Sequence, residues 1–433
     1  MNFLYEKLGE PAYFLEGDFG LEKECLRVDK DGYLSHTTHP FPDDASIDRD
    51  FCENQIEMIT GVYQSAKEVC SALADLQKKV TDRLLQLNTG AEYLWPFSNP
   101  PYVKGEEDIP IATFSGKAKE KQIYREYLAK KYGKKKMLFS GIHFNYSFSE
   151  KWLMAEYNKS EYSSYKEFKN DLYLELSKKI VKRSWFIVYL TAASPVIDGS
   201  YYRQQDLGMD VASRYASIRC GEAGYWNTFT PILNYDNLEG YADSIQSYVD
   251  NGQLKAFTEL YYPVRLKPKG QNTLENLKEN GINHIELRML DVNPLSPVGI
   301  MEEDLEFLHY FIWYLLFVED EKMESFEQVS AIRNMKMAAL YDEQEIRIES
   351  GWCKNVTVRD AALEILEDME RCFARMGRKQ IPCILAQQQK ILQKDGRYAV
   401  QIKKQFQHQY VEKGIRLAKQ YTIEAKDRNK CKE

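Results

Sequence analysis

Two stretches of the chain carry apolar residues at the three- and four-residue spacing of an amphipathic helix. Ser65 and Glu68 form a capping box at the start of the first stretch, and Gly90 follows its last apolar position. The second stretch begins at Thr357 and runs to Gly377. Because each stretch has a side chain that can cap its start and a glycine that favours its end, both are predicted as helices.

Two further segments are predicted as helical, in different surroundings. Residues 163–193 become more apolar toward their end, where Ser194 and Pro195 stop the pattern, so we expect one long helix that enters the core. The tail from Leu385 onward is rich in Lys and Gln. This composition predicts a helical and solvated tail.

Alternation with a period of two marks three short strands, at residues 20–28, 137–148 and 283–290. They lie irregularly between the helices without a repeating βαβ unit, which favours an α+β fold over a doubly wound parallel sheet. The sequence contains no G-x-x-x-x-G-K-[ST], G-x-G-x-x-G or G-x-S-x-G motif. P-loop, Rossmann and serine-hydrolase functions therefore lose their main support.

The middle strand has one apolar face and one polar face. The apolar face carries Ile142, Phe144, Tyr146 and Phe148. On the opposite face, His143 lies with Asn145 and Ser147. A single His in a strand is most often structural, but the neighbouring amide and hydroxyl favour the lining of a site.

Acidic residues occupy the centres of the other two strands. Glu22 and Glu24 project from one face of the first strand, and adjacent carboxylates repel unless a cation lies between them. A solvated outer face explains this segment best when it is taken alone. Glu286 and Arg288 alternate similarly in the third strand, where a surface ion pair is the simplest explanation. A surface ion pair does not explain why Glu and His recur at the centres of segments that alternate so clearly as strands.

Two other segments add candidates. Asp50 and Glu57 have opposite strand parity, so a bend must lie between them if both serve one site. The Lys- and Arg-rich residues 117–136 contain Tyr124 and Arg125 and are predicted to include a helix. Such a charge run is usually a solvated face, and the functional alternative is a rim that binds phosphates.

These segments together supply a set of oxygen-rich ligands and a set of cations. The candidate ligands are Glu22, Glu24, Asp50, Glu57, His143 and Glu286, and the cations are Arg125, Arg219 and Arg288. Hard carboxylate ligands select Mg²⁺ or Mn²⁺ over zinc. Such ions beside arginines are what phosphoryl transfer from ATP requires.

Composition narrows the range of partners. The chain has 433 residues and a formal net charge of −7, which argues against general affinity for nucleic acid or an anionic membrane. Its apolar stretches are too short to span a bilayer. Glu6 and Glu10 interrupt the N-terminus where a signal peptide would have its apolar core, so we expect no signal peptide. The eight cysteines form no Cys-x-x-Cys pair. We therefore predict a cytoplasmic protein with reduced thiols and without nucleic-acid or membrane partners. A monomer is the oligomeric state that we expect.

An ordered set of motifs extends from about residue 15 to residue 300. The motifs are Gly20–Val28, Asp50-Phe51 with Glu57, Tyr124-Arg125, Ser140–Asn145, Ala193–Pro195, Ser217–Arg219 with Gly224-Tyr225, Tyr261–Arg265 and Ile285–Pro294. In this order they resemble the bacterial glutamate–cysteine ligases, also called γ-glutamylcysteine synthetases. We expect a single catalytic domain over residues 1–433, with a motif-bearing core at about 15–300 and a helical part at about 301–433.

The resemblance implies a fold like the catalytic domain of glutamine synthetase, in which a curved, mainly antiparallel sheet forms a funnel with helices packed outside. It implies a metal cluster of Glu22, Glu24, Asp50, Glu57, His143 and Glu286. Arg219 and Arg288 would be the catalytic cations that bind phosphate or substrate carboxylate, and we assign Arg125 and Asn145 to ATP. The wall around the incoming cysteine would comprise Phe51, Tyr124, Leu128, Tyr225 and Tyr261.

The implied reaction joins the γ-carboxylate of L-glutamate to the amine of L-cysteine through a γ-glutamyl phosphate, with ATP as co-substrate and Mg²⁺ or Mn²⁺ as cofactor. This is the first step of glutathione synthesis. Tyr215–Arg219 is one residue shorter than in the proteobacterial branch, a departure that bears on the local shape of the pocket. Some relatives carry a fused ATP-grasp domain that adds glycine, and the length of this sequence leads us to expect a reaction that stops at γ-glutamylcysteine. The alternatives are a γ-glutamyl ligase with another amine acceptor, a non-catalytic regulator that binds nucleotide or amino acid, and a metal-dependent hydrolase.

Overall fold

The computed structural model describes residues 13–87, 91–319, 322–349 and 354–427. Its strands are β1 (Gly17–Val28), β2 (Ile47–Arg49), β3 (Gln55–Ile59), β4 (Tyr93–Leu94), β5 (Gly141–Phe148), β6 (Val196–Asp198), β7 (Asp210–Ala212), β8 (Val264–Lys267), β9 (His284–Asp291), β10 (Arg347–Glu349) and β11 (Lys354–Thr357). Its α-helices are α1 (Ala66–Leu85), α2 (Lys119–Tyr132), α3 (Glu150–Tyr157), α4 (Tyr165–Lys182), α5 (Ser184–Thr191), α6 (Leu238–Asp250), α7 (Leu274–Asn280), α8 (Glu302–Leu315), α9 (Ser325–Ala338), α10 (Val358–Arg375), α11 (Pro382–Leu392), α12 (Tyr398–Phe406) and α13 (Tyr410–Asp427).

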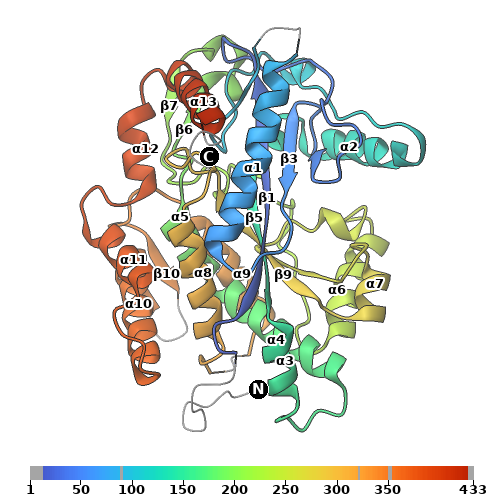
Figure 1. The fold of residues 1–433 in the computed structure, drawn as a ribbon, viewed down its shortest axis with the longest axis vertical. Coiled ribbons are helices and arrows are strands. Elements are labelled where there is room, and N and C mark those ends of the chain that lie inside the picture. Colours follow the sequence, from blue (N-terminus) through green and yellow to red (C-terminus); the bar gives the residue numbers. More distant parts are fainter. Residues whose placement is uncertain (1–12, 88–90, 320–321, 350–353, 428–433) are drawn as a thin grey trace.

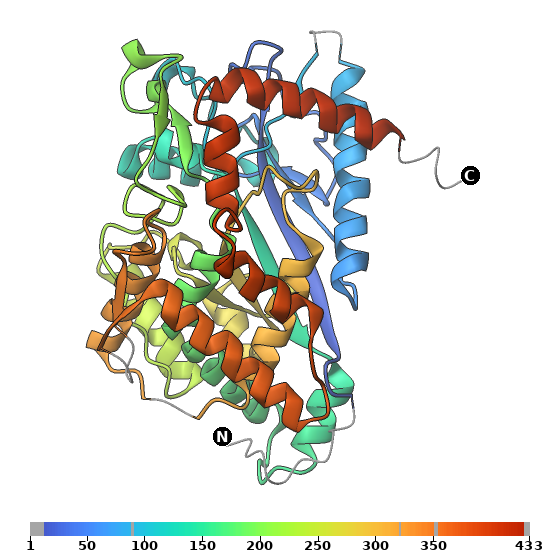
Figure 2. The ribbon, with the colours of Figure 1, turned by 90° about the vertical axis from the view of Figure 1, so that its left-hand side faces the viewer.

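An antiparallel sheet of seven strands runs through the middle of the molecule (Figure 1). The strand order is β2-β3-β1-β5-β9-β8, and β4 pairs with the end of β1. The sheet is open, with β2 and β8 at its two edges. Helices of both the early and the late chain surround it (Figure 2). This mixture confirms the predicted α+β class with a mainly antiparallel sheet.

One face of the sheet is buried under helices. On β5 the residues of the predicted apolar face, from Ile142 to Phe148, are all buried in the main apolar cluster. Helix α1 packs on β1 and β3, α4 packs on β8, and α5 packs on β9. Each large apolar side chain buried in this way stabilises the fold by roughly 1.5–3 kcal/mol. The polar residues of the same strands therefore lie on the opposite face.

The two capped helices form where the sequence predicts them. The Ser65 hydroxyl accepts a hydrogen bond from the Glu68 backbone N–H, at 3.2 Å, and α1 follows. The Thr357 hydroxyl caps α10 in the same way through Asp360, at 3.0 Å. Gly377 ends α10 with a φ of 77°, a conformation that glycine adopts without a steric penalty. Gly90 lies outside the described residues.

The prediction of one long helix over residues 163–193 is wrong. Two helices, α4 and α5, occupy this segment, and they meet at Arg183, whose φ of −109° and ψ of 13° are not helical. The Arg183 N–H bonds the carbonyl of Ile180, three residues back, and the Ser184 hydroxyl donates to Val181. This tighter turn closes α4 and lets α5 take its own direction against β9 and α9.

The predicted strand at 137–148 begins too early. Lys135–Leu138 form a short 3₁₀ helix, in which the Met137 N–H bonds the carbonyl of Lys134. The strand itself starts at Gly141. The apolar pair Met137 and Leu138 is buried in either conformation, so burial alone did not distinguish a turn from a strand here.

The C-terminal tail is helical as predicted, but it is not a solvated appendage. Helix α13 crosses the upper part of Figure 2 and packs against α1 and β4. Its residues Tyr410, Val411 and Ile415 are buried in a second apolar cluster that includes Trp95. At Gly414 a Cβ atom would lie only 2.3 Å from the Trp95 ring, so glycine allows the close approach.

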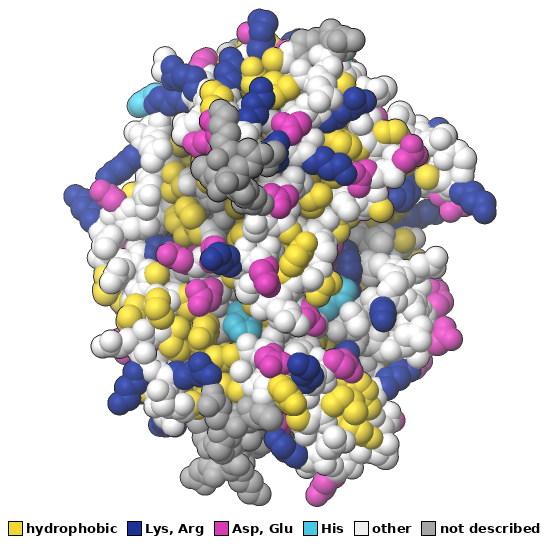
Figure 3. All heavy atoms as spheres, viewed as in Figure 1, with side chains coloured by type: hydrophobic (Ala, Val, Ile, Leu, Met, Phe, Trp, Pro, Cys, Tyr) yellow, Lys and Arg dark blue, Asp and Glu magenta, His cyan; other side chains and the backbone are white. Residues whose placement is uncertain are grey.

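Surface charge is mixed on the face drawn in Figure 3, where basic and acidic side chains are interspersed. Among the residues that the structure describes, no helix is long and apolar enough to cross a membrane. The predictions of a single domain, a cytoplasmic location and a monomer stay predictions.

Candidate active site

A cavity of about 410 Å³ lies on the polar face of the sheet. Of the residues that the sequence singles out for the site, it is lined by Glu22, Glu24, Asp50, Phe51, Glu57, Tyr124, Arg125, Leu128, His143, Arg219, Tyr225, Tyr261, Glu286 and Arg288. Residues from seven separate segments of the chain therefore meet in one place. Asn145 does not line the cavity directly.

The register of the sheet explains the meeting of the charged residues. On β1, Glu22 lies directly opposite His143 of β5, and Glu24 lies opposite Glu57 of β3. Directly opposed residues of an antiparallel pair project from the same face, with Cβ atoms about 4.5–5.5 Å apart. Glu286 of β9 lies opposite Asn145 in turn. Backbone pairing thus places these residues in one row, which we call the charged row: Glu22, Glu24, Glu57, His143 and Glu286.

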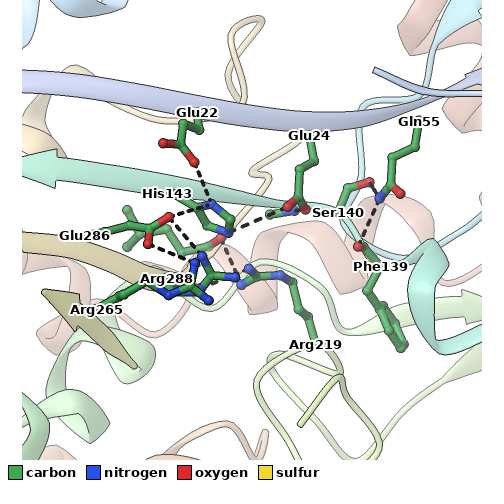
Figure 4. A network of polar contacts seen from close by, with 12 residues as sticks. Glu22, Glu24, Gln55, Phe139, Ser140, His143, Arg219, Arg265, Glu286 and Arg288 are labelled. Atoms are coloured by element: carbon green, nitrogen blue, oxygen red, sulfur yellow. Dashed lines mark hydrogen bonds and ion pairs between the residues drawn. The ribbon is translucent and has the colours of Figure 1, made fainter. Parts of the chain in front are cut away.

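His143 lies at the centre of this row (Figure 4). Its Nδ1 is 3.1 Å from Glu22 and 3.3 Å from Glu286, and its Nε2 is 3.6 Å from Glu24. Burial and Arg288 lower the pKa of the imidazole, but the hydrogen bonds with Glu22 and Glu286 outweigh them, so the pKa is raised. The predicted reading of His143 as part of a site lining is consistent with these contacts.

Glu286 is surrounded by cations. Arg288 donates to it at 2.9 Å, while Arg265 and Lys267 lie 3.6 and 3.7 Å away. Burial raises the pKa of Glu286, but these cations, led by Arg288, hold it well below the usual range. The buried side chain is therefore a carboxylate, and the solvated surface pair considered from the sequence does not describe it.

The carboxylates on the other side of His143 lack such compensation. Burial, followed by the charges of Asp50, Glu22 and Glu24, raises the pKa of Glu57 well above its usual range. Among the described residues no ion pair or side-chain hydrogen bond reaches its carboxylate. Burial also raises the pKa of Glu24, although Gly141 donates a backbone hydrogen bond to it at 2.8 Å. Crowded acids of this kind need a cation between them.

The donor set fits a divalent cation. One ligand atom each from Glu22, Glu57 and His143 lies within 4.8 Å of the others. The Oε2 atom of Glu286 and the Oδ1 atom of Asn145 are buried without a hydrogen-bond partner in the described part of the chain. Oxygen-rich sites with one imidazole suit Mg²⁺ or Mn²⁺.

The bend required between Asp50 and Glu57 is present. Strand β2 ends at Arg49 and β3 begins at Gln55, and between them the Asp50 N–H bonds the carbonyl of Gln55 at 3.1 Å. The turn lets Asp50 line the same cavity as Glu57 despite the opposite parity of the two residues.

Arg219 reaches the cavity across β5. Its guanidinium donates to the carbonyls of Leu290 at 3.1 Å and Arg288 at 2.9 Å. It lies over Gly141, where a Cβ atom would be 2.0 Å from Nη2. Only a residue without a side chain at position 141 leaves room for the guanidinium.

Arg125 and Asn145 are held by the protein itself. The Arg125 guanidinium donates to backbone carbonyls, including that of Arg49 at 3.1 Å, and it lies over the Phe114 ring. It still lines the cavity. The Asn145 amide donates to Glu22 at 3.0 Å, so its side chain orients an acid of the charged row. The assignment of both residues to ATP stays a prediction.

Aromatic residues form the opposite wall. The rings of Tyr225 and Tyr261 are 4.0 Å apart, and Tyr132 meets both of them edge-on. Tyr124 and Leu128 face the same space from α2, and burial raises the pKa of the Tyr124 phenol to about 12. These phenols remain protonated at neutral pH and can donate hydrogen bonds.

Sequence reasoning missed several residues of the lining. They are Lys121, Met137, Phe139, Trp226, Thr258, Tyr262, Arg265 and Lys267. Arg265 and Lys267 alternate on β8 with the buried Val264 and Leu266, so strand parity could have found them. The others lie in turns and on helix surfaces, where no simple period applies.

Comparison with known proteins adds to this geometry. A family model described as glutamate–cysteine ligase matches residues 4–258 and 249–338. The chain belongs to the glutamate–cysteine ligase family. The resemblance expected from the motifs is thereby confirmed.

Members of this family with curated names are similar over most of the chain. The glutathione biosynthesis bifunctional protein GshAB of Clostridium perfringens is 38% identical over 376 residues, which are 83% of this chain and 47% of that protein. GshAB of Listeria monocytogenes is 36% identical over 94% of this chain and 55% of its own length. The chain thus spans about half the length of these bifunctional relatives. The glutamate–cysteine ligase of Clostridium acetobutylicum is 35% identical over 76% of this chain and 78% of its own.

Solved structures of the glutamate–cysteine ligase family share the fold. A bifunctional glutathione synthetase from Pasteurella multocida superposes with a TM-score of 0.81 at 26% identity, over 96% of this chain and 54% of that one. A glutamate–cysteine ligase from Francisella tularensis, solved in complex with AMP, gives a TM-score of 0.83 at 22% identity over 95% and 89% of the two chains. At that identity the second likeness shows the fold alone.

Proposed function

We propose that the chain is a glutamate–cysteine ligase, which uses ATP and Mg²⁺ or Mn²⁺ to join the γ-carboxylate of L-glutamate to the amine of L-cysteine. One observation carries this proposal: a row of buried and half-buried acids around His143 shares a single cavity with Arg219, Arg288 and an aromatic wall. The acids suit a metal–phosphate complex, the arginines suit developing negative charge, and the wall suits a small acceptor.

The carboxylates and His143 hold the metal in this proposal. Glu22, Glu57 and His143 would supply ligands, with Glu24, Asp50 and Glu286 around them. A divalent cation bound there supplies counter-charge for phosphate oxygens. The cluster also explains the unbalanced acids described above, because positive charge among them removes their mutual repulsion.

Arg219 and Arg288 act on the transferred phosphoryl group and the glutamate carboxylate. Glutamate's γ-carboxylate is a poor electrophile, and phosphorylation turns it into an acyl phosphate with a good leaving group. Both guanidinium groups are fixed before substrate arrives, Arg219 by backbone carbonyls and Arg288 by Glu286. Preorganised donors of this kind stabilise charge that develops in the transition state without reorganising. The amine then attacks and phosphate leaves, so no protein nucleophile is needed.

Names of relatives support the same reaction. The relative that matches this chain over most of both lengths is named a glutamate–cysteine ligase, and the bifunctional relatives are named for glutathione biosynthesis. The Francisella structure contains AMP, which fits a nucleotide substrate. We infer a role in the first step of glutathione synthesis, with γ-glutamylcysteine as the product.

A γ-glutamyl ligase with another amine acceptor is the nearest alternative, because it would keep the charged row and change only the aromatic wall. Product analysis decides between the two. The chain is incubated with ATP, Mg²⁺, glutamate and a panel of amines, and the products are identified by mass spectrometry. We expect γ-glutamylcysteine and the analogous 2-aminobutyrate product. A panel in which only another amine is ligated would contradict the cysteine assignment.

Isotope transfer tests the activated intermediate. Glutamate labelled with ¹⁸O in its γ-carboxylate should pass label to inorganic phosphate during turnover, because the phosphate leaves with an oxygen from that carboxylate. Unlabelled phosphate would exclude an acyl phosphate and restore the hydrolase alternative. ATP binding without any turnover in either experiment would favour the regulator.

A further inference from the structure

Glu259 is a buried acid close to the cavity that does not line it. Its side chain is fully buried, at 0% exposure, and three hydrogen-bond donors converge on its carboxylate. The Lys131 ammonium and the Tyr132 hydroxyl, both on α2, donate to its carboxylate, the latter at 2.7 Å. The backbone N–H of Lys255 donates to its other oxygen. The carboxylate thus ties the end of α2 to the segment that precedes Tyr261.

Asn227 extends this connection to the rest of the wall. Its amide donates to the Glu259 carbonyl at 2.8 Å and to the Tyr132 hydroxyl at 3.2 Å. Its side-chain oxygen accepts from the backbone N–H of Tyr261 at 2.9 Å. Asn227 follows Tyr225 by two positions. All three segments that supply the tyrosine rings therefore converge on one buried hydrogen-bond network.

We propose that Glu259 is a positioning residue for the amine acceptor: through Tyr132 and Asn227 it fixes the rings of Tyr225 and Tyr261 in the geometry that receives the acceptor side chain. This inference rests on the proposed ligase function. It assigns Glu259 no contact with substrate. The acid acts through the edge-on contacts of Tyr132 with Tyr225 and Tyr261, whose ring centroids are 6.1 and 5.7 Å away.

The physical argument concerns which part of the cavity can move. The charged row is held by ladder hydrogen bonds of the sheet, whereas the two tyrosines lie outside regular strands and helices. A buried carboxylate with three donors makes charge-assisted hydrogen bonds, which are stronger than neutral ones. In the amide that would replace it, an NH₂ group takes the place of one carboxylate oxygen. This NH₂ group then faces at least one hydrogen-bond donor, so a buried polar group is left unsatisfied. Loss of these hydrogen bonds should therefore displace the aromatic wall and leave the charged row in place.

The test is a comparison of KM values in the purified chain. In Glu259→Gln we expect the KM for cysteine to rise about tenfold, the size expected from one charge-assisted hydrogen bond. The KM values for ATP and glutamate should stay within about twofold of the unaltered protein, since the charged row is independent of the network. Tyr132→Phe, which removes only the hydroxyl, should move the KM for cysteine in the same direction by a smaller factor.

Glu106→Gln is the matched control. Glu106 is an exposed acid that accepts hydrogen bonds from the backbone of Lys134 and Lys135, just beyond the same end of α2, and it does not touch the tyrosines. All three KM values should be unchanged in this variant. Thermal unfolding of each variant shows that the chains compared are folded.

The outcomes separate the two proposals. Normal ligation by the unaltered chain, with an unchanged KM for cysteine in both Glu259→Gln and Tyr132→Phe, would overturn the inference and leave the proposed function intact. An equal rise in the KM of all three substrates would also overturn it, because it would show a general loss of structure. Absence of cysteine ligation by the unaltered chain would overturn the proposed function, and the inference with it.

Discussion

The charged side of the cavity comes from neighbouring strands of one sheet, whereas its aromatic side comes from α2 and segments outside regular structure. On the charged side, Glu22 faces His143 because backbone pairing sets them opposite each other. On the aromatic side, Tyr225 meets Tyr261 because side chains such as Tyr132 hold them together. A substitution on the first side should change chemistry without moving the site, and one on the second side should change geometry.

The largest effect should come from neutralising the charged row. Glu22→Gln or Glu286→Gln keeps the shape of the side chain and removes its charge. We expect a folded protein whose ligation rate falls roughly a hundredfold or more, in line with lost electrostatic stabilisation of the transition state. Steady-state assays at saturating Mg²⁺ measure this. Asp18→Asn, on the same face of β1 but outside the cavity lining, is the control and should retain activity. Near-normal turnover of Glu22→Gln would refute the metal assignment.

A smaller loss of activity should follow when Arg219 is kept in the sequence but its guanidinium is moved. In Gly141→Ala the new methyl group would overlap the guanidinium, so the arginine has to move. A misplacement of about 1 Å can reduce turnover roughly 10- to 100-fold. Gly20→Ala is the matched control on the neighbouring strand, since its Cβ would meet its nearest atom at 3.4 Å, an ordinary contact. Equal activities of the two variants would show that Arg219 need not lie over β5.

The aromatic side should respond in substrate affinity. Tyr225→Ala removes a ring that packs on Tyr261, and we expect the KM for cysteine to rise about tenfold with little change for ATP. Discrimination of one methylene in such a wall is worth only about 1–3 kcal/mol, so 2-aminobutyrate should be accepted. Lysine should be refused, because its ammonium would be buried without a partner. A Tyr225→Ala variant with weakened ATP binding alone would contradict the division of the cavity into two sides.

The smallest effect should be on stability without metal. Glu57 is half-buried beside other acids and has no cationic partner among the described residues, so Glu57→Gln should relieve repulsion in the metal-free protein. We expect the Tm in EDTA to rise by about 1–2 °C, and the further rise on adding Mg²⁺ to be largely lost. Scanning calorimetry with and without Mg²⁺ measures both. A lower Tm in EDTA would mean that the acids do not repel one another as the structure indicates.

The two sides also differ in how far the sequence predicts them. Strand parity placed Glu22 and Glu24 on one face of their strand and His143 on the polar face of another, and it could have marked Arg265 and Lys267 in the same way. Parity alone did not bring β1, β5 and β9 together, since the pairing of strands more than 100 residues apart is a property of the whole fold. The ordered motifs supplied that step through the resemblance to a family.

Errors in the fold have a common physical origin. Beside the break at Arg183 lie the buried Ile180 and Val181, and the 3₁₀ turn before β5 contains the buried Met137 and Leu138. Either local conformation can bury these apolar residues. Apolar periodicity reports burial, and it distinguishes poorly between alternatives that bury the same residues. The wall tyrosines were found only through motifs for a related reason, because residues outside regular elements carry no period.

The contact between Trp95 and α13 has a consequence for how the molecule is made. The Tyr410 hydroxyl bonds the carbonyl of Asn99, 311 positions earlier in the chain. At the usual pace of synthesis, this separation corresponds to on the order of half a minute. During that interval the segment around Trp95 has emerged but its covering helix has not. Until α13 is synthesised, the nascent chain therefore exposes an aromatic surface around Trp95. Mutations that slow the docking of α13 should reduce the yield of folded protein before they alter any property of the folded enzyme.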